Sequence, residues 1–136
     1  MTAMMIQALR NADGQLHVEL AVDPAAVHAP TSCLDFLSRA SVGFGSDGRL
    51  AAVNLFEVPG ALARIAPALD RDTPTFCPHE HAWIDWWLDD GWAWFPVTLE
   101  RKVTTLAGLG SASVAIHDDR VVALRLDVPR SRETAR

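Results

Sequence analysis

Apolar and polar residues alternate near the start of the chain, around a clear turn signal. After the Asp13-Gly14 pair, apolar residues recur at every second position: Leu16, Val18, Leu20 and Val22. A period of two places one set of side chains on the core face of a β-strand and the other set in water. An Asp-Gly pair supplies the positive φ that a tight turn requires. The pattern therefore predicts a β-hairpin over residues 5–22.

Two later stretches, 41–58 and 113–128, repeat one pattern so closely that they read as copies. Each consists of a short apolar run, a turn, an arginine and a second apolar run, and each closes on a Val-Pro pair at or just after its end. Two β-prone runs around a turn are typical of a hairpin. We therefore expect three hairpins, with the last two in equivalent, pseudo-symmetric places.

Two short helices are predicted between the hairpins. Ser32 has the position of a helix N-cap, with an acid three residues later, and this start predicts a helix over residues 32–40. Apolar residues at helical spacing predict a second helix over residues 60–69, which Pro67 must kink or shorten. Residues 106–110, which include two glycines, are predicted to form a loop.

Together these elements predict an α+β fold in a single domain that spans residues 1–129. Its main part is a mostly antiparallel sheet built from repeated β-hairpins, accompanied by the two short helices. The chain has 136 residues, of which 49% are apolar, so it can build a core without disulfides. Residues 130–136 are predicted to be a disordered basic tail.

The net charge of −5 limits the classes of partner that we expect the protein to bind. The tail carries three arginines and one glutamate, so the rest of the chain carries −7. An acidic body repels phosphate backbones, and we therefore expect no nucleic-acid partner. No apolar run is long enough for a membrane span, and the start of the chain lacks the pattern of a signal peptide. The two cysteines form no recognisable framework, which favours a cytoplasmic protein with reduced thiols.

The segment 76–97 holds all five tryptophans of the chain. Trp and Ile favour a strand, and acids such as Asp89 and Asp90 are unfavourable at the C-terminus of a helix. We therefore expect a strand-turn-strand that reverses at Gly91. The alternative is a helix that begins at Pro78 and ends before the same glycine.

The same segment carries a candidate metal site. If it is extended, His79 and His81 project from one face about 6.6 Å apart, a workable spacing for two imidazoles on one metal, whereas on a helix they point apart. Asp85 lies on that face about 13 Å further along, and His117 would approach from the last hairpin. The pair, the acid and Gly91 resemble the first motif of the cupins, which implies a divalent metal ion. The sequence departs from the cupin pattern in using Asp85 for the usual glutamate and in lacking the second motif around His117.

The tryptophans and their acidic neighbours predict a second kind of site. Tryptophan is enriched in protein-binding surfaces, and the acids would give such a surface a negative rim that suits a basic partner. The alternative is that the indoles fill the core. The residues predicted to bind are Trp83, Trp87, Trp92, Trp94, Asp85 and Asp89.

We therefore expect a non-enzymatic binding domain without a cofactor, whose partner is a protein with a basic surface. One competing interpretation is a small metal-binding protein or metalloenzyme. Another is a pocket for an apolar small molecule between the sheet and the helices. Unpaired hairpin edges also favour a homodimer formed by sheet extension. The sequence itself does not decide between an enzyme and a binding protein.

Overall fold

The computed structural model shows a single antiparallel sheet. The residues that it describes are 5–11, 13–21, 32–64, 87–89, 91–97, 101–117 and 120–133. Within these residues the only helix is a short 3-10 helix, η1 (Gly60–Arg64), and no helix is long and apolar enough to cross a membrane. The predicted mostly antiparallel sheet of one domain is confirmed. The α+β class is wrong for the described residues, because they contain no α-helix.

Nine strands of the described chain make up the sheet. They are β1 (Met5–Arg10), β2 (Leu16–Ala21), β3 (Ser32–Phe44), β4 (Leu50–Leu55), β5 (Trp87–Asp89), β6 (Trp92–Pro96), β7 (Thr104–His117), β8 (Arg120–Val128) and β9 (Arg132–Glu133). Their spatial order is β1-β2-β8-β7-β3-β4-β6-β5, with β9 paired to β7 beside this path. Every pairing is antiparallel, so neighbouring strands can be joined by short connections.

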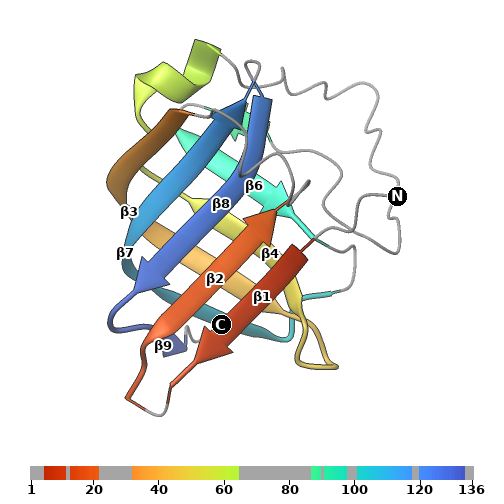
Figure 1. Cartoon of the computed structure of the whole chain (residues 1–136). Helices are drawn as coiled ribbons and strands as arrows, with labels where there is room; N and C mark the ends of the chain where they lie inside the picture. The colour runs from red at the N-terminus through yellow and green to blue at the C-terminus, as the bar shows by residue number, and fades with distance from the viewer. Residues whose placement is uncertain are drawn as a thin grey trace.

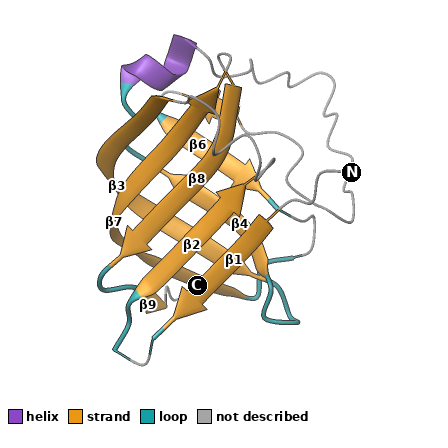
Figure 2. Cartoon of the chain, in the orientation of Figure 1, coloured by secondary structure: helices purple, strands orange, loops and turns teal. Residues whose placement is uncertain are grey.

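The sheet curls into a half-barrel. In Figure 1, β3, β7, β8, β2 and β1 lie side by side in one layer, and β4 and β6 cross behind them. Figure 2 shows that strands dominate the described chain and that η1 lies at one end of the sheet. A right-handed twist accumulated over many strands produces such curling. One face of the sheet is thereby turned inward and can be buried without a covering helix.

The inner face carries the core. Its largest fully buried side chains come from both layers: Leu16, Val18, Leu20, Val42, Val53, Leu55, Phe95, Val114, Leu124, Leu126 and Val128, together with Leu62 of η1. On β2 and β8 these side chains occupy alternate positions, as period-two burial requires. β4 is buried along its whole length, which shows that its second face is also covered.

The pairing of β3 with β7 is the longest in the sheet. It runs without interruption from Ser32 opposite Ile116 to Phe44 opposite Thr104. Residues 40–44 of β3 also pair with β4, and residues 111–117 of β7, at the other end of the ladder, also pair with β8. The two long strands therefore connect the two layers of the half-barrel.

All three predicted stretches contain a hairpin. β1 and β2, the end of β3 and β4, and the end of β7 and β8 pair in sequence order. Gly14 and Gly48 adopt φ values of 92° and 80° in the first two turns, a conformation that costs a residue with a Cβ more than it costs glycine. The pseudo-symmetry of the last two hairpins stays a prediction.

The predicted helix over 32–40 is wrong, because these residues form the first part of β3. Their exposure follows a period of two: Leu34 and Phe36 pack against the core, while Cys33, Asp35 and Leu37 are exposed. A helix would place these two sets on overlapping faces. For the second predicted helix, η1 covers only Gly60–Arg64, and the remainder lies outside the described residues.

The predicted loop over 106–110 is also wrong, because it belongs to β7. Its two glycines allow other backbone to come close. A Cβ on Gly108 would lie 2.7 Å from both the carbonyl oxygen of Arg130 and Cγ1 of Val128, and one on Gly110 would lie 2.8 Å from Cδ1 of Leu126. Glycine inside a strand often marks such a close approach rather than a loop.

Residues 130–133 differ from the predicted disordered tail, and residues 134–136 lie outside the described residues. Arg132 and Glu133 form β9, and they pair with Ala107 and Leu106 of β7. Just before them, Ser131 is buried, and both its backbone N–H and its hydroxyl donate to the carbonyl of Gly14, at 2.7 and 2.6 Å. This contact ties Ser131 to the first hairpin turn.

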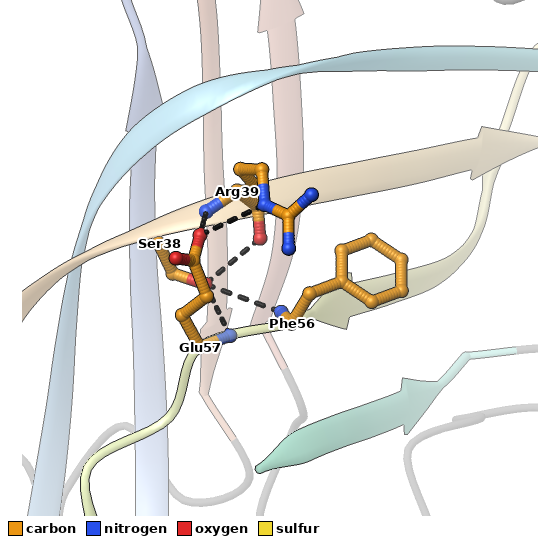
Figure 3. A network of polar contacts seen from close by, with 4 residues as sticks. All are labelled: Ser38, Arg39, Phe56 and Glu57. Atoms are coloured by element: carbon orange, nitrogen blue, oxygen red, sulfur yellow. Dashed lines mark hydrogen bonds and ion pairs between the residues drawn. The ribbon is translucent and has the colours of Figure 1, made fainter.

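A buried serine marks the place where β3 and β4 separate (Figure 3). Ser38 is fully buried, and its Oγ accepts hydrogen bonds from the backbone N–H groups of Phe56 at 3.2 Å and Glu57 at 3.0 Å. The same hydroxyl donates to the carbonyl of Arg39 at 2.8 Å. The backbone N–H of Arg39, with its side chain, donates to the Glu57 carboxylate and lowers the pKa of that group. These side-chain bonds, together with a backbone bond from the Phe56 N–H to the Arg39 carbonyl at 3.0 Å, hold the chain just after β4.

Replacing Gly108 with alanine is expected to destabilise the protein by about 1–3 kcal/mol, because the new Cβ overlaps backbone that has little room to move. Urea unfolding monitored by circular dichroism measures the change. The matched control is Gly60→Ala, where a Cβ meets nothing within 4 Å. Its effect should stay within about 0.5 kcal/mol. Equal stability of both variants would contradict the close approach.

Ser38→Ala should lower the free energy of unfolding by about 1–3 kcal/mol, because it removes the hydroxyl that accepts from the Glu57 N–H. The same unfolding measurement applies, and Ser111→Ala, an exposed serine in β7, serves as the control. A loss for Ser38→Ala no greater than that of the control would show that water replaces the hydroxyl.

Candidate functional site

The strongest candidate site lies on the hairpin of β5 and β6. Trp87 is paired with Trp94, Leu88 with Ala93 and Asp89 with Trp92. Gly91 turns the chain with a φ of 84°. The predicted strand-turn-strand around Gly91 is therefore confirmed over residues 87–96, apart from Asp90, which lies outside the described residues.

The two faces of β6 differ in character. Ala93 and Phe95 are fully buried in the core. Trp92 and Trp94 occupy the alternate positions and therefore point to the opposite, outer face. Trp92 remains 39% exposed, and Trp94 is half-buried. The alternative interpretation, in which the indoles fill the core, is therefore wrong for Trp92.

A hydrogen bond to Asn54 of β4 holds Trp92 in place. Its indole Nε1 donates to Oδ1 of Asn54 at 2.9 Å, and Asn54 is only 7% exposed. The backbone of Asn54 pairs with that of Trp94, so Asn54 reaches diagonally to the neighbouring tryptophan. A buried amide oxygen needs a donor, and an indole N–H needs an acceptor. The bond satisfies both groups and fixes the orientation of the ring.

A third aromatic residue lies close to this hairpin. Phe56 follows β4 and is 42% exposed. Its carbonyl oxygen lies 4.0 Å from the place of a Cβ on Gly91, and the N–H of Val58 donates to the Gly91 carbonyl at 2.9 Å. We call the outer surface formed by Asn54, Trp92 and Trp94, with Phe56 beside its turn, the tryptophan face.

The structure locates only some of the predicted binding residues. Trp92 and Trp94 lie together on the tryptophan face, and the backbones of Trp87 and Asp89 lie directly opposite them in β5. Trp83 and Asp85 lie outside the described residues. The hydrogen bond of Asn54 to Trp92 was not predicted, because nothing in the sequence links Asn54 to a tryptophan 38 positions away.

Of the four residues predicted to bind a metal, the structure describes one, His117. His117 lies at the end of β7, half-buried and paired with Arg120 in the hairpin. His79, His81 and Asp85 lie outside the described residues, so the proximity of the four stays a prediction. Within the described residues, no group of three or more His, Cys, Asp or Glu side chains could hold a metal ion.

A second polar cluster lies on the outer face of β2 and β8, and the sequence did not reveal it. Nδ1 of His17 is 2.5 Å from Oδ1 of Asp127, and its Nε2 is 3.1 Å from Oε1 of Glu19. Nε of Arg125 is 3.2 Å from the same glutamate oxygen. The hydrogen bond that His17 donates to Asp127 is the main cause that raises the pKa of His17 above its ordinary value of 6.5.

Comparison with known proteins adds no relative, since no family model, curated protein or solved structure matches the chain. Its function is therefore inferred from the geometry of the site.

The bond between Asn54 and Trp92 should appear as a coupling in a double-mutant cycle of Asn54→Ala and Trp92→Phe. Because phenylalanine lacks the indole N–H, we expect a coupling free energy of about 0.5–1.5 kcal/mol in urea unfolding. Asn54→Ala combined with Trp94→Phe is the control, and it should give a smaller coupling. Additive effects of Asn54→Ala and Trp92→Phe would contradict the bond.

Proposed function

We propose that the protein is a non-enzymatic binding protein and that its tryptophan face binds a protein partner with a basic surface. The observation that carries the proposal is Trp92, which is 39% exposed although it belongs to a strand whose other face is fully buried. Tryptophan is enriched among the residues that dominate binding energy at protein interfaces.

The hydrogen bond to Asn54 supports this role. A side chain that is already fixed loses little conformational entropy when a partner arrives. Asn54 holds the Trp92 ring by its N–H at 2.9 Å, and this leaves part of the indole surface open. A residue that served the core alone would bury that surface.

The charge of the chain supports a basic partner. The net charge is −5, and Asp89 lies opposite Trp92 in the β5–β6 register. Arginine and lysine are attracted both to an acidic surface and to the face of an indole ring. The combination favours a partner that presents a guanidinium or ammonium group to Trp92.

Two model peptides of equal length test the proposal, one rich in arginine and one rich in glutamate, each with the same apolar residues. We expect the arginine-rich peptide to bind and to change the tryptophan fluorescence. Trp92→Ala should weaken its binding at least about tenfold, because truncating a central interface tryptophan typically costs 2 kcal/mol or more. Isothermal titration calorimetry gives the affinities.

The control is Leu109→Ala, which removes a more exposed apolar side chain, 59% against 39% for Trp92, from β7. It should bind like the wild type, and circular dichroism should show that both variants are folded. Preference of the wild type for the acidic peptide, or an equal loss in both variants, would refute the proposal. Unfolding of Trp92→Ala would assign this tryptophan to the core, and the proposal would then fail as well.

A further inference from the structure

The polar cluster on β2 and β8 has a regular origin in the strand register. His17 is directly opposite Asp127, and Glu19 is directly opposite Arg125. Residues that face each other across an antiparallel pair share one face of the sheet, and here it is the outer one, since Leu16 and Val18 point to the core. Two acids and two basic groups therefore alternate across this pair of strands.

The hydrogen bonds of His17 suit its protonated form. Both ring nitrogens have a carboxylate oxygen within hydrogen-bond distance, at 2.5 Å on Asp127 and 3.1 Å on Glu19. A neutral imidazole carries one N–H and can donate to only one of these acceptors, whereas the imidazolium donates to both. Loss of the proton would leave one carboxylate facing a nitrogen lone pair.

The charges around His17 lead to the same conclusion. The charged groups that face it in the described chain are Asp127 and Arg125 of β8 and Glu19 of its own strand. From β1 it faces Leu9, which does not titrate. With an imidazolium the four groups are neutral in sum, and with a neutral imidazole they carry one uncompensated negative charge.

The position of the cluster gives it a structural consequence. Within the described residues, β1 pairs only with β2, and β2 joins the rest of the sheet through β8. The first hairpin is therefore attached to the sheet along the strand pair that His17 bridges. A second attachment, from Ser131 to Gly14, lies at the turn of the hairpin.

We propose that His17 is a pH-sensitive clamp: its imidazolium fastens the hairpin β1–β2 to β8 through Asp127, with Glu19 of its own strand as the second acceptor, and loss of the proton loosens the hairpin.

The sign of the pH dependence follows from the direction of the pKa shift. Hydrogen bonding to Asp127 is the largest cause that raises the pKa of His17 above 6.5, burial acts against it, and Glu19 raises it further. A group whose pKa is raised by folding contributes stability that is fully present below its unfolded value. This contribution is lost as the pH rises through the folded pKa. The clamp is therefore closed at pH 5.5, below the unfolded value, and opens as the pH rises through the folded pKa of His17.

Amide hydrogen exchange measured by NMR on the full chain tests the proposal between about pH 5.5 and pH 8.5. After correction for the intrinsic exchange rates, the protection of the β2 amides should fall with rising pH relative to that of the β3–β7 amides. We expect a relative fall of at least about threefold, since a shift of one pKa unit corresponds to a factor of ten. In His17→Gln the relative fall should disappear.

Two further measurements keep the test decisive. Asp127→Asn, which removes the closer carboxylate, should reduce the relative fall, whereas Glu57→Gln, which removes an exposed ion pair elsewhere, should leave it unchanged. The imidazole nitrogen shifts of His17 give its pKa directly, even if a variant fails to fold. A pKa at or below 6.5, or the same relative fall in His17→Gln as in the wild type, would overturn the proposal.

Discussion

The continuous pairing of β3 with β7 is the constraint on which the rest of the structure depends. It extends from Ser32 opposite Ile116 to Phe44 opposite Thr104. Because side chains alternate with a period of two, this one register decides which residues of both strands face the core. Each of the two strands has a second edge that this ladder does not use, and other strands pair with these edges at different positions along the ladder. β4 takes one of them on β3, and β8 and β9 take the other on β7.

The two candidate surfaces follow from this arrangement. Beyond β4, the sheet continues to β6 and β5 and presents Trp92 on its outer face, fixed by Asn54. Beyond β8, it continues to β2 and β1 and presents His17 between two carboxylates. Both surfaces lie opposite buried core residues, so the strand positions that carry them are set by the packing of the inner face. The core thereby determines where the polar and aromatic chemistry is displayed.

Local patterns predicted those elements whose cause is local. Gly14 and Gly91 turn hairpins that the sequence marks by itself, and the alternation of Trp92 and Trp94 places them on one face. The errors arise where a distant strand decides. Ser32 resembles a helix cap, which is worth about 1 kcal/mol, but β7 supplies a partner for the whole segment and a core for Leu34 and Phe36. The contacts of Asn54 with Trp92 and of His17 with Asp127 join residues 38 and 110 positions apart, and no sequence period signals them.

The most direct test of the account is an NMR measurement of cross-strand contacts between β3 and β7. Nuclear Overhauser effects between the backbones should link residues near Leu34 with those near Val114, and residues near Val42 with those near Leu106. Both sets are expected, because the register runs through the whole length of β3. Helical contacts between residues three apart over 32–40, with no contact to β7 there, would contradict the account.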